Sequence, residues 1–179
     1  MQEVLGFLMI ILIILGLYYI FVYNRLQRLS NSVQEASSGI DIALLKRYDL
    51  ISSLVETVKG YSKHEREVFK EVAAIRNYLQ TDRTTASEQM DETSGKLLAV
   101  VESYPELKAS EQFLNLQKNM TNVEEHLQAS RRLYNRSVTE LNNVIRVFPT
   151  NIIANNHNIV AAKLFETSID LASKDKITF

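Results

Sequence analysis

The feature that most constrains this chain is an uncharged, apolar run near its N-terminus, from Val4 to Val22. An α-helix rises about 1.5 Å per residue, so roughly 20 apolar residues cross a hydrocarbon core of about 30 Å. Tyrosines gather where the run ends, and amphipathic rings favour the headgroup level of a bilayer. The sequence therefore predicts a transmembrane helix over residues 4–23, with residues 1–3 as a short extracytoplasmic N-terminus.

A cleaved signal peptide is the alternative interpretation of the same run, and three features disfavour it. The residues before the run include Glu3 but no Lys or Arg, the run is longer than the usual roughly 7–15 residues, and no Ala-x-Ala site follows. Basic residues follow the run, at Arg25, Arg28, Lys46 and Arg47. By the positive-inside rule we expect a single-pass membrane protein, with its N-terminus outside and its C-terminal domain in the cytoplasm.

The composition limits the fold and the chemistry of the remainder. The 179 residues include 2 Pro, 5 Gly and no Cys. Few turn residues argue against an all-β fold, and the absence of Cys excludes disulfides and Cys-based metal sites. The net charge of -1 gives no reason to expect nucleic acid as a partner. We therefore expect an all-α protein.

Apolar residues spaced three and four apart predict four amphipathic helices. The first continues from the membrane run to Arg47, and a second covers Ile51–Leu79, with Asp49 expected as its N-cap. The third covers Ala86–Tyr104, opened by a capping box at Thr85 and closed by Pro105.

The fourth and clearest helix covers Phe113–Phe148 and stops at Pro149. Short connections favour an antiparallel arrangement of neighbouring helices. The predicted fold is thus a transmembrane helix continuing into a cytosolic antiparallel four-helix bundle over residues 24–149, in preference to a two-helix coiled coil. Residues 150–179 are expected to form a partly irregular tail: an Asn-rich, loop-prone patch, a possible short helix over Ala161–Leu171, and Lys176–Phe179 as an edge strand or a trailing end.

No catalytic, cofactor-binding or metal-ligating pattern is found. His64 is followed by Glu65, but the H-E-x-x-H zinc motif needs a second His at position 68, which is Val. Phosphate-binding and nucleophile motifs are also missing. Glu65 falls on an apolar stripe, so one hypothesis pairs it with Arg131, and the other leaves both side chains at the solvent edge.

Several segments together resemble the LemA family of bacterial membrane proteins. They are Tyr23–Leu26, Asp41–Ile42, Leu45–Ile51, Leu54–Tyr61, Tyr104–Ala109, Phe113–Leu114, Leu116–Gln117, Ala129, Arg131–Arg132, Tyr134–Asn135, Phe148–Pro149 with Asn151, and the C-terminal Lys176–Phe179. The resemblance implies a single-pass protein of the bacterial inner membrane, with an outside N-terminus, a cytosolic helical bundle and no enzymatic activity. It also implies an HtpX-like membrane zinc metallopeptidase as a plausible partner.

The resemblance carries over no catalytic residue, but it marks candidate interaction or structural positions. These are Arg47, Tyr48, Asp49, Glu56, Tyr61, Arg131 and Tyr134. The first five surround the predicted corner between the first two helices, where they either cap and pack that corner or bind a partner.

We accordingly expect a non-enzymatic, membrane-anchored scaffold or adaptor without a cofactor or small-molecule substrate. Its expected partners are the lipid bilayer, a second copy of the chain, or another membrane protein. The alternative function is a signalling or sensor subunit that transmits through the membrane helix. The segment preceding that helix, Met1–Glu3, is short for binding a ligand, which weakens this alternative.

Overall fold

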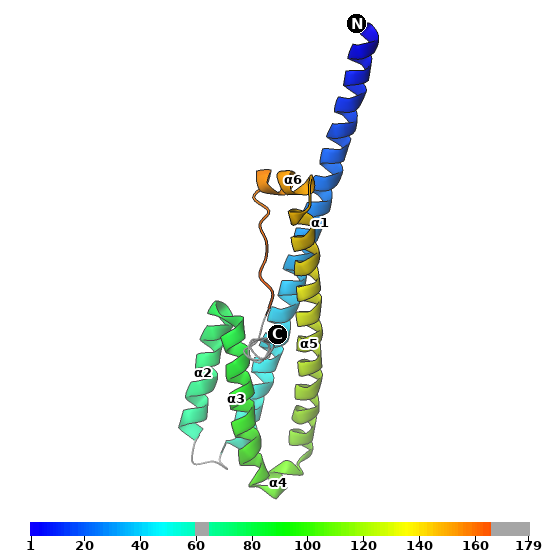
Figure 1. Cartoon of the computed structure of the whole chain (residues 1–179). Helices are drawn as coiled ribbons and strands as arrows, with labels where there is room; N and C mark the ends of the chain where they lie inside the picture. The colour runs from blue at the N-terminus through cyan, green and yellow to red at the C-terminus, as the bar shows by residue number, and fades with distance from the viewer. Residues whose placement is uncertain (60–64, 166–179) are drawn as a thin grey trace, which may run out of the picture. The chain divides into compact units, whose positions relative to one another are not determined.

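The structure is a computed structural model that describes residues 1–59 and 65–165, with the backbone alone for residues 65–69. Within those ranges every regular element is an α-helix (Figure 1). The prediction of an all-α protein that begins with an apolar helix is confirmed.

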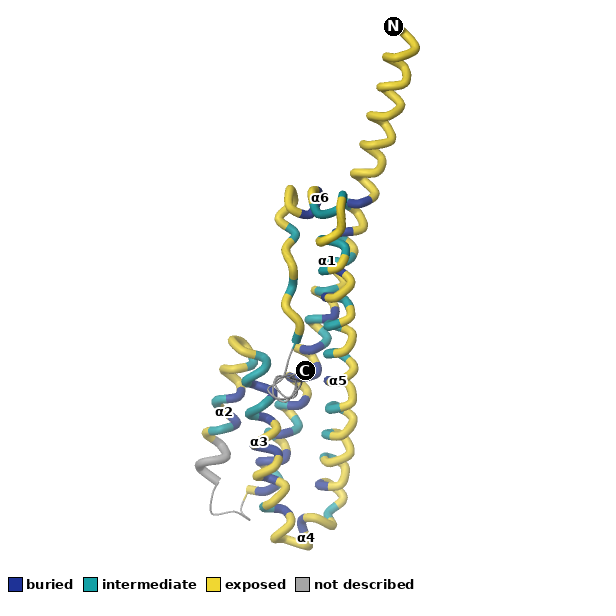
Figure 2. Tube along the Cα trace, in the orientation of Figure 1, coloured by how far each residue is buried: buried dark blue, intermediate teal, exposed yellow. Residues whose placement is uncertain are grey.

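Helix α1 (Gln2–Val58) carries the apolar run at its N-terminal end. All residues from Met1 to Phe21 are exposed, and burial begins at Val22 (Figure 2). Among the described residues, α1 is the one helix long and apolar enough to cross a membrane, and its most apolar stretch is not buried at all. That stretch is a candidate membrane span.

The predicted connection at Arg47–Leu50 is wrong, because α1 continues through it without a break. Asp49 lies in the helix interior rather than at an N-cap. The physical reason is that Arg47 is buried and belongs to the stripe. When Arg47 is counted, the buried positions form a single series at three- and four-residue spacing: Ile40, Leu44, Arg47, Ile51, Leu54 and Val58.

Helices α2 (Glu65–Thr81) and α3 (Arg83–Glu102) pack side by side and are joined by Asp82 (Figure 1). The short connection predicted here is confirmed, but the capping box at Thr85 is wrong. Asp82 is the N-cap, and its carboxylate accepts hydrogen bonds from the amides of Thr84 and Thr85 at 3.0 and 3.2 Å. Helix α3 therefore begins at Arg83, earlier than predicted, because the Asp82 carboxylate caps the amides of Thr84 and Thr85.

Pro105 does not simply end the third helix, because a short helix α4 (Pro105–Lys108) begins at this residue. Proline is tolerated at the first helical position, where its missing N–H would have no helical partner. Helix α5 (Glu111–Arg146) follows and agrees with the predicted fourth helix. The Ser110 hydroxyl accepts from the Phe113 amide at 3.2 Å, as an N-cap does.

Most of the Asn-rich patch is helical rather than a loop, because Asn151, Asn155 and Asn156 belong to helix α6 (Thr150–Asn156), which follows a cis Phe148–Pro149 peptide bond. The last residues of the patch, 157–158, form a turn beyond the helix. Its Ile153 and Ala154 are buried against Val22 and Leu26 of α1. This apolar contact supplies the stability that local propensity lacks. Residues 161–165 of the helix suggested over Ala161–Leu171 are not helical, and the rest, like Lys176–Phe179, lies outside the described residues.

The chain divides into two compact units, and both α1 and α5 contribute to each. Unit 1 contains residues 1–36 and 133–164, including α6. Unit 2 contains residues 37–132 and the last residues from 165, including α2, α3 and α4. Each unit is described separately below.

Candidate functional site

Helix α3 presents three polar side chains on one face of unit 2, at four-residue spacing: Arg83, Ser87 and Asp91. Positions four apart lie one above another on a helix. Each of the three bonds to a residue of another helix, in α1 or α5. We call this row the α3 polar ladder.

Arg47 of α1 is the most deeply buried charged residue described, with a side chain 7% exposed. Its guanidinium donates to Asp91 of the α3 polar ladder and lies 3.2 Å from the Glu124 carboxylate of α5. A buried charge has to be paired because its desolvation is costly. One cation thus joins three helices through two carboxylates, which are 60% and 39% exposed.

Arg83, at the other end of the ladder, bonds to two residues of α1. It donates to the Asp41 carboxylate at 2.7 Å and to the Ser37 hydroxyl at 2.7 Å. Asp41 and Arg83 are both more than a third exposed, so this pair contributes less than the buried one.

Arg131 donates to the buried Ser87 hydroxyl at 2.6 Å and lies 5.0 Å from the centroid of the Phe165 ring. The proposed partner Glu65 has a side chain outside the described residues. Both arginines among the candidate positions therefore bond to the α3 polar ladder: Arg47 to Asp91, and Arg131 to Ser87.

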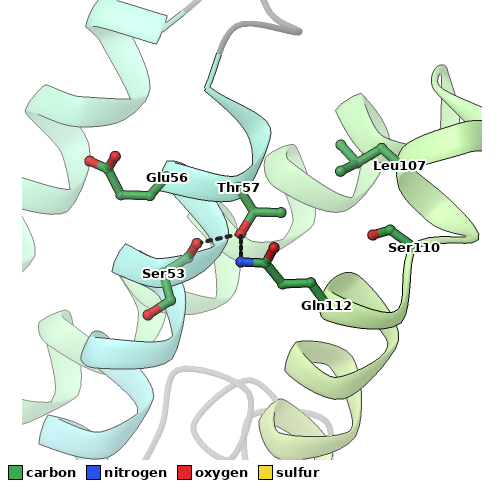
Figure 3. Close-up of a pocket in the computed structure, with 6 residues that line it drawn as sticks. All are labelled: Ser53, Glu56, Thr57, Leu107, Ser110 and Gln112. Atoms are coloured by element: carbon green, nitrogen blue, oxygen red, sulfur yellow. Dashed lines mark hydrogen bonds between the residues drawn. The ribbon is translucent and has the colours of Figure 1, made fainter.

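Unit 2 also contains an open cavity of about 590 Å³ at the C-terminal end of α1 (Figure 3). It is lined by Ser53, Glu56, Thr57, Leu107, Ser110 and Gln112. Thr57 donates to the Ser53 carbonyl at 2.8 Å, and the Gln112 amide donates to the Thr57 hydroxyl at 3.5 Å. Glu56 is the candidate site residue that lines this cavity, and it pairs with Lys59 at 3.6 Å.

The remaining candidate positions do not converge on either feature. Tyr48 is half-buried and Asp49 is exposed, and their carbonyls accept the hydroxyls of Ser52 and Ser53, both at 2.9 Å. Tyr61 lies outside the described residues. Tyr134 belongs to unit 1, where its hydroxyl donates to the carbonyl of Lys163 at 3.0 Å.

Sequence reasoning missed several polar contacts because their partners are distant in the chain. In unit 1 the Tyr19 hydroxyl lies 2.7 Å from His157 Nε2, and the Tyr23 and His157 rings are 4.5 Å apart. The Asn142 side chain bonds to both the N–H and the carbonyl of Ala162, at 3.0 and 2.9 Å. The sequence offered one signal for these contacts: Asn142 is a polar residue that directly follows the buried Leu141 of α5.

Two exposed groups of unit 2, Lys96 and Asp82, have shifted pKa values. The pKa of Lys96 is raised above its ordinary value, first by hydrogen bonding to Glu71 and then to Glu92. The pKa of Asp82 is lowered, first by the hydrogen bond from the Thr85 hydroxyl. In the described part of the chain no three His, Asp or Glu side chains are placed to hold a metal ion.

The geometry defines an all-helical protein with an apolar N-terminal helix and interhelical ion pairs. A sequence model of the LemA family matches residues 36–179. The chain is also 30% identical over 176 residues to "Protein LemA" of Metamycoplasma hominis, covering 93% of this chain and 80% of the relative. The chain belongs to the LemA family, and this membership together with the apolar helix indicates a membrane-anchored protein.

Proposed function

We propose that this protein is a non-enzymatic, membrane-anchored helical scaffold that binds a second copy of itself or another membrane protein. The observation that carries the proposal is an apolar pair on α1 in unit 2. Ile42 and Leu45 are 57% and 54% exposed and one turn apart. A partner that covers these two side chains would remove their apolar surface from water, which favours binding.

The proposal includes an antiparallel four-helix bundle in unit 2. It is supported by the order of contacts between α1 and α5. Thr57 meets Gln112, Arg47 meets Glu124, and a Cβ on Gly39 would lie 3.6 Å from Ser130. Along this series of contacts the residue numbers decrease on α1 and increase on α5, as expected for two helices that run in opposite directions.

Two kinds of partner fit such a surface, and both are proposals. A second copy would present the same pair and bury it symmetrically. An HtpX-like membrane metallopeptidase, anchored in the same bilayer, would meet the surface at high effective concentration. We place the scaffold in the bacterial inner membrane, with its N-terminus outside and unit 2 in the cytoplasm.

Photo-crosslinking in native membranes tests this function. A benzoylphenylalanine side chain replaces Ile42 or Leu45 in the full chain, and Leu114 of α5, 52% exposed, is the matched control position. We expect adducts of defined mass from positions 42 and 45 and none from 114. An adduct of twice the chain mass identifies a second copy, and mass spectrometry identifies any other partner.

The double variant Ile42→Glu/Leu45→Glu should abolish co-purification of that partner from detergent-solubilised membranes. Both side chains are more than half exposed, so helix content by circular dichroism should not change. Monomer alone at positions 42 and 45 would contradict the scaffold function, as would equal adducts at all three positions.

A further inference from the structure

Helix α6 lies against α1 at the level where the uncharged run ends. Its Ile153 and Ala154 form a buried cluster with Val22 and Leu26, and Tyr23 and Ile159 pack beside them. Just beyond the helix, His157 bonds to Tyr19 and stacks near Tyr23. These contacts place α6 beside residues 19–26 of α1, and Figure 1 shows that α6 runs across the direction of α1.

That stretch of α1 coincides with the expected edge of the hydrocarbon. From Val4 to Val22 a helix rises about 28 Å, close to the roughly 30 Å thickness of a bilayer core. The headgroup layer adds about 5–7 Å on each side. Because Leu26 is about 6 Å beyond Val22, a helix packed on both residues lies at headgroup depth.

The composition of the segment around α6 fits this depth. Between Arg146 and Lys163 no Asp, Glu, Lys or Arg occurs. Its outward side chains combine apolar and amide groups: Phe148 is 74% exposed, Ile152 is 52% exposed, and Asn155 and Asn156 are exposed. Neutral polar and apolar side chains together suit the membrane interface, where one side is apolar and the other wet.

We propose that α6 and the turn before it, residues 147–156, form an interfacial element that rests in the headgroup layer of the membrane crossed by α1. Phe148 and Ile152 contact lipid, while Ile153 and Ala154 hold the element against α1. The occupant of this surface is the bilayer, because α6 packs on Val22 and Leu26, directly after the exposed apolar run that ends at Phe21. Binding needs no anionic lipid because α1 already holds the element at the membrane.

The chain contains no Trp, so a single introduced Trp reports its own surroundings. The full-length Phe148→Trp and Ile152→Trp variants are reconstituted in phosphatidylcholine vesicles, with and without lipids brominated near the headgroup. Phe21→Trp, in the span, is the inserted control. Leu133→Trp, 56% exposed and on α5 of the same unit, is the aqueous control.

We expect blue-shifted emission that brominated lipid quenches for the Phe148 and Ile152 variants, and no quenching for the Leu133 variant. Adding phosphatidylglycerol should change neither signal. Emission typical of water at both positions would overturn the proposal. So would a blue shift without lipid quenching, because protein rather than lipid would then cover the surface. If brominated lipid quenches only the Phe21→Trp variant, α1 crosses the membrane but residues 147–156 do not rest in the headgroup layer, and the proposal is rejected.

Discussion

Arg47 is the residue on which the packing of unit 2 most depends. It occupies a core position of α1, yet carries a charge that Asp91 of α3 and Glu124 of α5 balance. A buried ion pair seldom adds stability over an apolar pair, but breaking it leaves groups without counter-charge. Its fork of donors reaches two carboxylates at once, which a lysine cannot reproduce.

Replacing Arg47 by Ala should lower the free energy of unfolding by about 2–3 kcal/mol, less than the roughly 3–5 kcal/mol of a fully buried pair because the carboxylates reach water. Circular dichroism of the detergent-solubilised full chain during denaturation measures this. Lys46, the exposed residue next to Arg47, is the control position. The Lys46→Ala variant should change the free energy of unfolding by less than about 0.5 kcal/mol. No coupling in an Arg47→Ala/Glu124→Gln cycle would contradict the pairing.

Asp82 predicts a dependence of stability on pH. Hydrogen bonds from Thr85 and Thr84 lower its pKa in the folded chain. Its contribution is therefore present above the unfolded pKa of a carboxyl and disappears as the pH falls through the lower folded value. Asp82→Ala should reduce the melting temperature at pH 7, and the difference from the parent should shrink below about pH 4.

The exposed Asp49 is a matched control for Asp82, because it lies inside α1 and its carboxylate caps no helix. Asp49→Ala should leave the melting temperature nearly unchanged at both pH values. A loss equal to that of Asp82→Ala would indicate instead that Asp49 is an N-cap.

At the level of elements, tertiary contacts decide where the helices begin and end. Periodicity located α3 and α5 to within a few residues of their structural bounds, and it placed the start of α1 correctly but not its end. It failed at Arg47, because a charged residue was taken as the end of a stripe. It failed again at α6, because an Asn-rich segment becomes helical only when Ile153 and Ala154 pack against α1.

A proline at Leu50 distinguishes a continuous α1 from the predicted corner. If Asp49 were an N-cap, Leu50 would be the first helical position and would tolerate proline. Inside α1, Leu50→Pro should cost about 3 kcal/mol or more, since it removes a helical hydrogen bond and clashes with the preceding turn. The free energies of unfolding of the full-length Leu50→Pro and Leu50→Ala variants are compared. Because both variants lose the leucine side chain, their difference measures the backbone effect of proline alone. Equal stability of the two variants would contradict the continuous helix.

At the level of the whole molecule, the central question is which side of the membrane holds unit 2. The chain contains no Cys, so single cysteines can report exposure to each side. With Gln2→Cys and Lys118→Cys, an impermeant maleimide added to spheroplasts should label position 2 only. Position 118 should react after detergent is added, because positive flanks favour the cytoplasm. The reverse labelling would reject the proposed orientation.

The sequence by itself determined the class of this protein: an apolar span and helical periodicity, both of which depend on local residue order. Its LemA membership was also readable from short motifs. Only the tertiary structure decided that α1 is one helix through Arg47, that Arg131 bonds to Ser87, and that α6 packs at the end of the span. These features depend on partners 44 or more positions away in the chain, and no local pattern encodes such pairings.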